Sequence, residues 1–230
     1  MVFLDSRKSL VAAAAVAVLA ASTSTSAAVI TSGITPTASG SFGSGWAGGL
    51  ADTINGTGLS GTAGSEVHAG TGTVGWMVDD GDGPAVDVWI QWDLGQSYSL
   101  DSVKVWNLGN AIGGAWGARS VDVFYSNVAT PGDPEAAGAA NWTQLGSTLE
   151  FAAADDPTSG FDLETLAGTS ITGDVRYIRF EINSQWGSAV GGSDDGRVGI
   201  GEIQFTEVPE PSSLALMAIG GLLIARRRRA

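Results

Sequence analysis

Residues able to carry out catalysis are scarce in this sequence. His68 is the only histidine and the chain has no cysteine, which excludes a multi-histidine metal site, a thiolate nucleophile and a disulfide scaffold. No Gly-x-Ser-x-Gly nucleophile elbow occurs, and no glycine-rich loop carries a phosphate-binding lysine. Two carboxylates in so acidic a chain do not argue for a glycosidase. We therefore expect a protein that is not an enzyme, and we expect His68, in the glycine-rich stretch 60–75, to be solvated.

Clustered carboxylates are the remaining groups with obvious chemistry. Asp79 to Gly83 and Asp194 to Gly196 are acidic runs broken by glycine, and neither has the spacing of an EF-hand calcium loop. Such runs are typical of solvated turns. Because clustered acids also raise the local concentration of cations, weak calcium binding outside the cell stays open as the alternative.

The charge of the chain limits its partners. Of its 230 residues, 24 are acidic and 11 are basic, and the formal net charge is −13. Nucleic-acid binding needs clustered lysine and arginine to neutralise phosphates, so we expect no nucleic-acid partner. With both ends set aside, the length suits one domain that buries a core of its own.

The elements between residues 29 and 206 are predicted to be strands. Apolar and polar residues alternate through 86–93, 103–105, 121–125 and 175–182, and the last of these places Ile178, Phe180 and Ile182 on one face. Glycine, serine, asparagine and aspartate cluster between the runs. Many short strands separated in this way indicate an all-β fold, a β-sandwich or jelly roll.

The order of four segments resembles the discoidin or coagulation-factor C-type domain of the galactose-binding-like group. They are Leu50 to Gly58, Trp89 to Gly95, Arg176 to Phe180 and Val198 to Phe205, which correspond to an early loop and three strands of that family. The resemblance covers roughly residues 30 to 206 and implies a jelly-roll β-sandwich. The sequence departs from this family in two ways. It lacks the cysteines that flank the domain in the coagulation-type members, and it contains the long insert 60–75.

The resemblance also implies a structural calcium ion between the early loop and the last strand. Asp52, Asn55, Thr57 and Glu202 occupy the matching positions, and calcium prefers such a mixture of carboxylate, amide and hydroxyl oxygens. The alternative is an Asx turn beside an exposed glutamate.

Sugar binding is the function that this resemblance suggests first. Trp116 and Trp186 lie in glycine-rich loops between predicted strands, and aromatic faces stack on sugar rings while polar neighbours bind hydroxyls. Arg119 and Arg197 are the expected hydrogen-bond donors. The alternative for both tryptophans is packing that anchors their loops.

The N-terminal residues 1–28 are predicted to be a secretory signal peptide. Arg7 and Lys8 precede an apolar run from Leu10 to Ala21 that is too short to span a bilayer comfortably. Small residues at 26–28 suit cleavage after Ala28, so signal peptidase and the general secretion machinery are expected partners.

The C-terminal residues 208–230 combine three features in order. The triplet Pro209, Glu210 and Pro211 is followed by an apolar segment, Leu214 to Ala225, and then by the basic run Arg226, Arg227, Arg228 and Arg229. Arginines stay on the cytoplasmic side of a membrane, so the apolar segment is predicted to be a short transmembrane helix that stops export. The triplet is then left just outside the bilayer.

This tail resembles the PEP-CTERM sorting signal. In that family an exosortase, an integral membrane protease-transpeptidase of Gram-negative bacteria, recognises the triplet and removes the tail. The resemblance covers residues 208–230 only and implies an exported protein, anchored transiently in the inner membrane and then placed at the cell surface or in the extracellular matrix. With the signal peptide 1–28 and the predicted sandwich domain 29–207, the tail 208–230 completes the expected organisation.

Taken together, the predictions favour a non-catalytic surface or matrix protein that binds carbohydrate or exopolysaccharide. A structural matrix or ice-associated protein without a discrete ligand site is the alternative. A polysaccharide hydrolase or lyase of the same fold is the third reading.

Overall fold

The computed structural model describes residues 27–42, 48–62, 65–69, 74–79, 87–109, 114–135, 139–154 and 158–209. Residues 29 to 207 form one compact unit. Within the described ranges no helix is long and apolar enough to cross a membrane. The predicted transmembrane segment 214–225, the basic run 226–229, Glu210 and Pro211 lie outside the described residues, as does the signal peptide up to residue 26.

The described elements are mostly strands, with one short α-helix and two 3₁₀ turns. In chain order they are β1 (Ala28–Val29), β2 (Thr35–Ala38), η1 (Leu50–Thr53), β3 (Leu59–Ser60), β4 (Val67–His68), β5 (Trp76–Asp79), β6 (Val88–Asn107), β7 (Ala118–Ser126), β8 (Thr143–Gln144), β9 (Leu149–Glu150), β10 (Thr158–Ser159), β11 (Phe161–Asp162), α2 (Leu163–Ala167), β12 (Asp174–Gln185), η2 (Gly187–Val190) and β13 (Arg197–Glu207).

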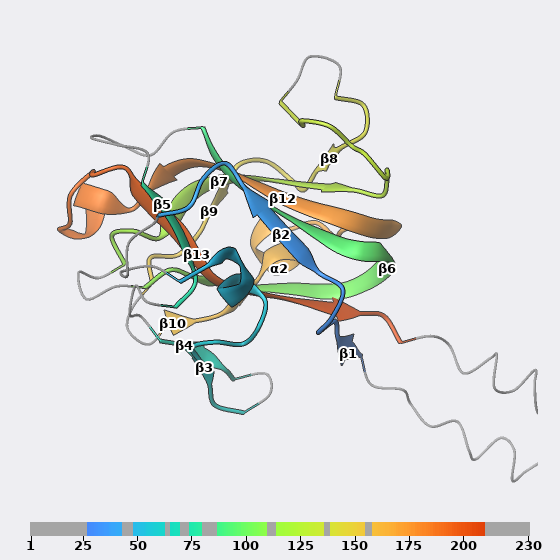
Figure 1. Cartoon of the computed structure of the whole chain (residues 1–230), viewed down its shortest axis with the longest axis horizontal. Helices are drawn as coiled ribbons and strands as arrows, with labels where there is room; N and C mark the ends of the chain where they lie inside the picture. Colours follow the sequence, from blue (N-terminus) through green and yellow to red (C-terminus); the bar gives the residue numbers. More distant parts are fainter. Residues whose placement is uncertain are drawn as a thin grey trace, which may run out of the picture. The chain divides into compact units, whose positions relative to one another are not determined.

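The long strand β6 belongs to both layers of a β-sandwich. Its first half pairs with β2 and β12, and β12 continues to β7, which also pairs with β8 and β9. Its second half pairs with β13 and β11, and β13 pairs with β5. Figure 1 shows β2, β6, β12 and β7 side by side. The expected all-β jelly-roll sandwich is confirmed.

The core lies between the two layers and is built on aromatic side chains. Trp92 contacts Phe180 edge-on at 4.9 Å and Phe205 at 6.3 Å between ring centroids, and Phe151 contacts Phe180 at 5.5 Å. All four side chains are fully buried. Edge-to-face rings at these separations stabilise a core beyond their buried area.

The alternation read from the sequence matches the burial of β12. Ile178, Phe180 and Ile182 are buried in the core, as predicted. Residues 88–93 and 103–105, read as parts of two strands, instead lie on the single strand β6, which continues through Gly95 in a left-handed conformation at φ +79°. Val86, read as the start of the first run, lies outside the described residues. A β-carbon at Gly95 would lie 2.7 Å from the carbonyl oxygen of Gly33, so the close approach of two backbones at this bend requires glycine.

Candidate functional site

The early loop, Leu50 to Gly58, is held by hydrogen bonds within the loop and by one hydrogen bond to a core side chain. Thr53 donates to the carbonyl of Leu50 at 2.7 Å and accepts from the indole N–H of Trp92 at 3.1 Å. The Asp52 carboxylate accepts from the Gly49 N–H at 2.7 Å and from the Asn55 amide at 3.0 Å. The loop is therefore fixed to the centre of the sandwich and presents a carboxylate and an amide close together.

The expected link between this loop and the last strand is present. The Gly56 N–H donates to Glu202 Oε1 at 3.0 Å, and the Thr57 N–H donates to Asn55 Oδ1 at 2.7 Å, which makes an Asx turn. Glu202 on β13 is 1% exposed, so the alternative of an exposed glutamate is wrong.

Glu202 carries an unsatisfied oxygen. Its Oε2 is buried and has no hydrogen-bond partner among the residues that the structure describes. Burial raises the pKa of Glu202 from 4.5 to about 8, the Gly56 N–H opposes this rise, and the negative charge of Asp52 adds to it. A buried carboxylate oxygen without a partner is costly, and a proton on it, or a donor or cation beside it, reduces that cost.

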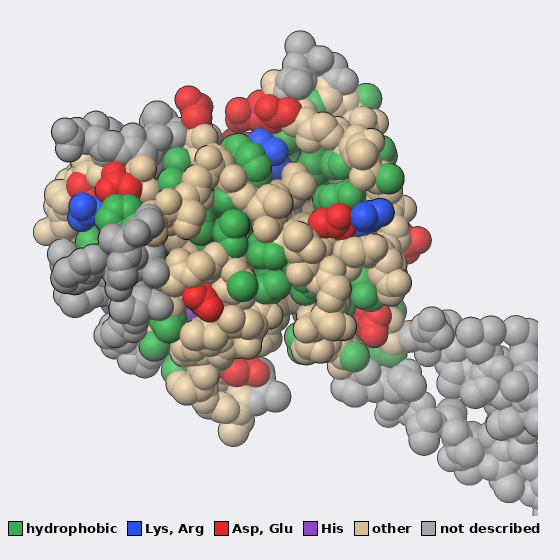
Figure 2. Space-filling model, in the orientation of Figure 1, with side chains coloured by type: hydrophobic (Ala, Val, Ile, Leu, Met, Phe, Trp, Pro, Cys, Tyr) green, Lys and Arg blue, Asp and Glu red, His purple; other side chains and the backbone are tan. Residues whose placement is uncertain are grey.

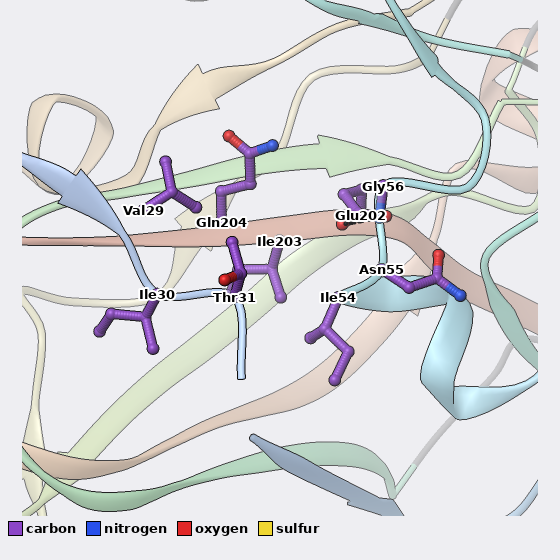
Figure 3. Close-up of a pocket in the computed structure, with 9 residues that line it drawn as sticks. All are labelled: Val29, Ile30, Thr31, Ile54, Asn55, Gly56, Glu202, Ile203 and Gln204. Carbon is purple, nitrogen blue, oxygen red and sulfur yellow. Dashed lines mark hydrogen bonds between the residues drawn. The ribbon is translucent and has the colours of Figure 1, made fainter. Parts of the chain in front are cut away.

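A pocket of about 310 Å³ opens beside Glu202. Figure 3 shows Gly56 and Glu202 at one end and Val29 and Gln204 at the other. The walls between them are largely aliphatic, from Ile30, Ile54 and Ile203, with Thr31 and Asn55 as further polar lining. The pocket offers a route from solvent to the buried carboxyl group.

These residues fit a hard cation by their chemistry. Asp52 and Glu202 are close enough for their charges to interact, Asn55 and Thr57 add neutral oxygens, and Glu202 Oε2 has no partner in the described ranges. Over the described part of the chain, no group of three or more histidine, aspartate or glutamate side chains could hold a metal ion. A cation here would depend on amide, hydroxyl and backbone oxygens as well.

A second candidate site forms where two loops meet at one end of the sandwich. The N–H of Trp186 donates to the carbonyl of Gly117 at 3.1 Å, and the N–H of Gly187 donates to the carbonyl of Ala115 at 2.8 Å. Trp116 and Trp186, 70 residues apart in sequence, are thereby brought to the same edge. We call Trp116, Arg119, Trp186 and Arg197 the two-tryptophan edge.

Each tryptophan of the two-tryptophan edge carries an arginine over its ring. The guanidinium carbon of Arg197 lies 5.6 Å from the Trp116 ring centroid, and that of Arg119 lies 4.7 Å from the Trp186 ring centroid. Both tryptophans are half-buried. The pairing places flat apolar surface next to hydrogen-bond donors, which is the combination that sugars require.

Trp186 also anchors its loop. Its indole N–H donates to the carbonyl of Phe151 at 3.0 Å, while the Trp116 carbonyl accepts from the N–H of Gly199 at 2.9 Å. A β-carbon at Gly199 would lie 2.1 Å from the Trp76 carbonyl oxygen on β5, so only glycine lets β13 approach β5 so closely at this point. Trp186 thus combines ring exposure with the anchoring role given as its alternative.

Sequence reasoning missed the carboxylates that hold the two arginines. Arg197 pairs with Asp79 at 3.3 Å and with Asp195 at 3.1 Å, and Arg119 pairs with Glu150 at 3.6 Å. The spacing of two residues between Asp195 and Arg197, across a turn at Gly196, was the one signal in the sequence. Of the two acidic runs, Asp80 and Asp82 lie outside the described residues, and Asp194 accepts from Ser188.

The expectation that His68 is solvated is wrong. His68 lies on β4 and is fully buried, and burial lowers its pKa. β-Carbons at Gly58 and Gly201 would each lie 2.9 Å from an imidazole nitrogen. Two glycines therefore make the room that the ring occupies, which the glycine-rich composition alone did not reveal.

The end of the chain matches a family model. Residues 207–229 match the PEP-CTERM protein-sorting motif. This confirms the resemblance read from Pro209, Glu210 and Pro211 and the residues that follow them. The motif indicates an exported protein that is processed at a membrane.

Comparison with solved structures finds carbohydrate-binding domains. No curated protein matches the chain in sequence. The family 32 carbohydrate-binding module of NanJ from Clostridium perfringens, in complex with galactose, is 14% identical with a TM-score of 0.49 and covers 79% of this chain and 100% of its own. Chitosan-binding module 1 of a chitosanase/glucanase from Paenibacillus sp. IK-5 is 19% identical with a TM-score of 0.45, over 77% of this chain and 98% of its own.

The lectin domain of lectinolysin, complexed with Lewis B antigen, is 15% identical with a TM-score of 0.46, over 78% of this chain and 96% of its own. These comparisons show that the backbones of these domains follow a similar path. The strand pairing of this chain itself defines its fold.

Proposed function

We propose that residues 29 to 207 form a non-catalytic carbohydrate-binding domain of an exported protein, and that the two-tryptophan edge is its binding site. The observation that carries this proposal is the meeting of Trp116 and Trp186, from loops far apart in sequence, each beside an arginine. The ring surface left open by each arginine offers a platform for a sugar ring, and the paired arginines and carboxylates offer donors and acceptors for hydroxyl groups.

Glycan-array binding by the full chain tests this proposal. We expect binding that Trp116→Ala abolishes, because the Trp116 indole nitrogen makes no hydrogen bond to the described backbone, so that the substitution removes ring surface without breaking an anchor of the loop. Trp89→Ala is the matched control, since Trp89 also carries an arginine, Arg179 at 4.2 Å, on the face of the sheet between β2 and β12. Loss of binding in both variants, or in neither, would refute the assignment of the edge.

We further propose that the tail directs this domain to the cell surface or matrix. The PEP-CTERM match at 207–229 supports processing by an exosortase. In this proposal the signal peptide 1–28 starts export, the segment 214–225 halts it in the inner membrane, and Arg226 to Arg229 stay inside. Replacing Pro209 and Pro211 with alanine is expected to leave the uncleaved protein in the membrane fraction; release of the variant at the normal rate would contradict the proposal.

We also propose that Asp52, Asn55, Thr57 and Glu202 hold a calcium ion. The unpartnered Glu202 Oε2 and the nearby Asp52 support this set. The ion would tie the early loop to β13 and satisfy the buried carboxyl group, which is a structural role.

A further inference from the structure

All basic side chains of the sandwich domain are paired with carboxylates. The chain has 24 acidic and 11 basic residues. Asp5, Glu210 and six basic residues (Arg7, Lys8 and Arg226 to Arg229) lie outside 29–207, which leaves 22 acidic against 5 basic side chains and a formal charge of −17. The pairs are Lys104 with Glu66, Arg119 with Glu150, Arg176 with Asp93, Arg179 with Glu181 and Asp133, and Arg197 with Asp79 and Asp195, at N–O distances of 2.5 to 3.6 Å.

The visible surface agrees with this pairing. On the face in Figure 2, every patch of lysine or arginine adjoins a patch of aspartate or glutamate. A ligand that approaches the described surface of the domain therefore meets no basic side chain that is not already neutralised. Excess negative charge of this size sets up a field that acts over about 8 Å at physiological ionic strength.

At the two-tryptophan edge the carboxylates are within reach of a ligand. The side chains of Asp79 and Asp195 are 29% and 24% exposed, and that of Glu150 is 66% exposed. An acidic sugar would have to displace these carboxylates from Arg119 or Arg197 to form an ion pair. A sugar with a positive charge can bind them without breaking any existing pair.

The aromatic rings at the edge already bind a cation of the chain itself. The guanidinium of Arg197 lies 5.6 Å from the Trp116 ring and 5.4 Å from the Phe42 ring, between Asp79 and Asp195. Two aromatic faces with two carboxylates are a favourable environment for organic cations. A protonated amine on a sugar finds the same combination of ring faces and carboxylates around Arg197.

We propose that the two-tryptophan edge selects sugars that carry protonated amino groups, such as a deacetylated amino-sugar polymer, and excludes acidic polysaccharides. This inference rests on the proposed function of the same edge and adds the chemical class of its ligand. The long-range negative charge brings the polymer to the surface, and Asp79, Asp195 and Glu150 pair with its amines beside the tryptophan rings.

Isothermal titration of the full chain in detergent tests the selection. The probes are hexamers of glucosamine, N-acetylglucosamine and mannuronic acid at pH 5.5, each at 50 and 300 mM NaCl. One exposed ion pair changes affinity by about threefold, so two pairs predict glucosamine binding about tenfold tighter than N-acetylglucosamine binding. The higher salt concentration should reduce this advantage, and mannuronate should not bind.

Two variants separate the edge from the overall charge. Asp195→Asn and Glu150→Gln should each weaken glucosamine binding about threefold, with the fold checked by circular dichroism. The matched control is Asp174→Asn, which removes an exposed charge at the far end of β12 from Trp186 and should leave the affinity unchanged.

The outcomes distinguish a failure of this inference from a failure of the proposed sugar-binding function. Equal affinity for the glucosamine and N-acetylglucosamine hexamers, or tighter binding of mannuronate, overturns the inference while the sugar-binding function stands. An equal effect of Asp174→Asn and Asp195→Asn overturns it as well, because long-range charge alone would then explain the preference. Absence of binding to every glycan on the array overturns the proposed function, and the inference with it.

Discussion

Glu181 is expected to make the free energy of unfolding depend on pH, and the size of this effect follows from the surroundings of its carboxyl group. It lies on β12, 4% exposed, and its Oε1 accepts from Arg179 Nε at 2.5 Å. Burial raises the pKa of Glu181 from 4.5 to about 7, Arg179 opposes the rise, and the charges of Glu135 and Asp133 add to it. Between these two values the folded protein holds a proton that the unfolded chain has lost.

The sign and the magnitude follow from this difference. Because the folded pKa is above the unfolded one, the stabilising contribution is complete below pH 4.5 and is lost as the pH rises through 7. The span from 4.5 to about 7 corresponds to about 3 kcal/mol. Solvent reaches the pair through Asp133, whose side chain is 58% exposed, so screening lowers the expected loss to about 2 kcal/mol.

Urea denaturation between pH 5 and 7.5, with chelator present throughout, measures this loss. The free energy of unfolding of the wild type should fall by about 2 kcal/mol relative to Glu181→Gln across this range. Glu150→Gln, which changes a carboxylate that is 66% exposed, should run parallel to the wild type. A wild-type curve parallel to that of Glu181→Gln, or one that rises relative to it, would refute the reasoning.

Three other perturbations have defined outcomes. Calcium at a hundredfold excess over its Kd should stabilise the wild type by about 2.7 kcal/mol, raising Tm by several degrees in calorimetry; the same rise in Glu202→Gln would count against the calcium site. Gly199→Ala places a β-carbon 2.1 Å from the Trp76 carbonyl oxygen and should lower the free energy of unfolding in urea by about 3 kcal/mol, whereas a loss under 1 kcal/mol would show that β13 moves aside easily. Thr53→Val leaves the buried Trp92 indole N–H without its partner and should cost about 1–3 kcal/mol by the same assay, and an unchanged midpoint would contradict the anchoring of the early loop.

The features that follow from strand periodicity were predictable from the sequence. The inward row Ile178, Phe180 and Ile182 needed only the period of two that a strand imposes, and the burial of all three follows. The contact of Gly56 with Glu202, 146 residues apart, was not visible in any local pattern. It was anticipated only because the order of the segments resembled a known domain.

The features that depend on long-range packing were not predictable. Arg197 finds Asp79 across 118 residues through the pairing of β13 with β5, and a single sequence holds no record of that register. His68 is buried because Gly58 and Gly201 leave space on either side of it. The pairing of Trp116 with Trp186 depends on bonds between two loops, which periodicity does not address.

The indole N–H signals of the eight tryptophans, followed by nuclear magnetic resonance during titration with a glycan, test the binding edge most directly. Addition of a glucosamine hexamer should shift the signals of Trp116 and Trp186, while those of Trp92 and Trp106, which are fully buried, stay in place. Shifts that appear at Trp89 and leave Trp116 and Trp186 unchanged, or no shift at any tryptophan with any glycan that the protein binds, would contradict the account.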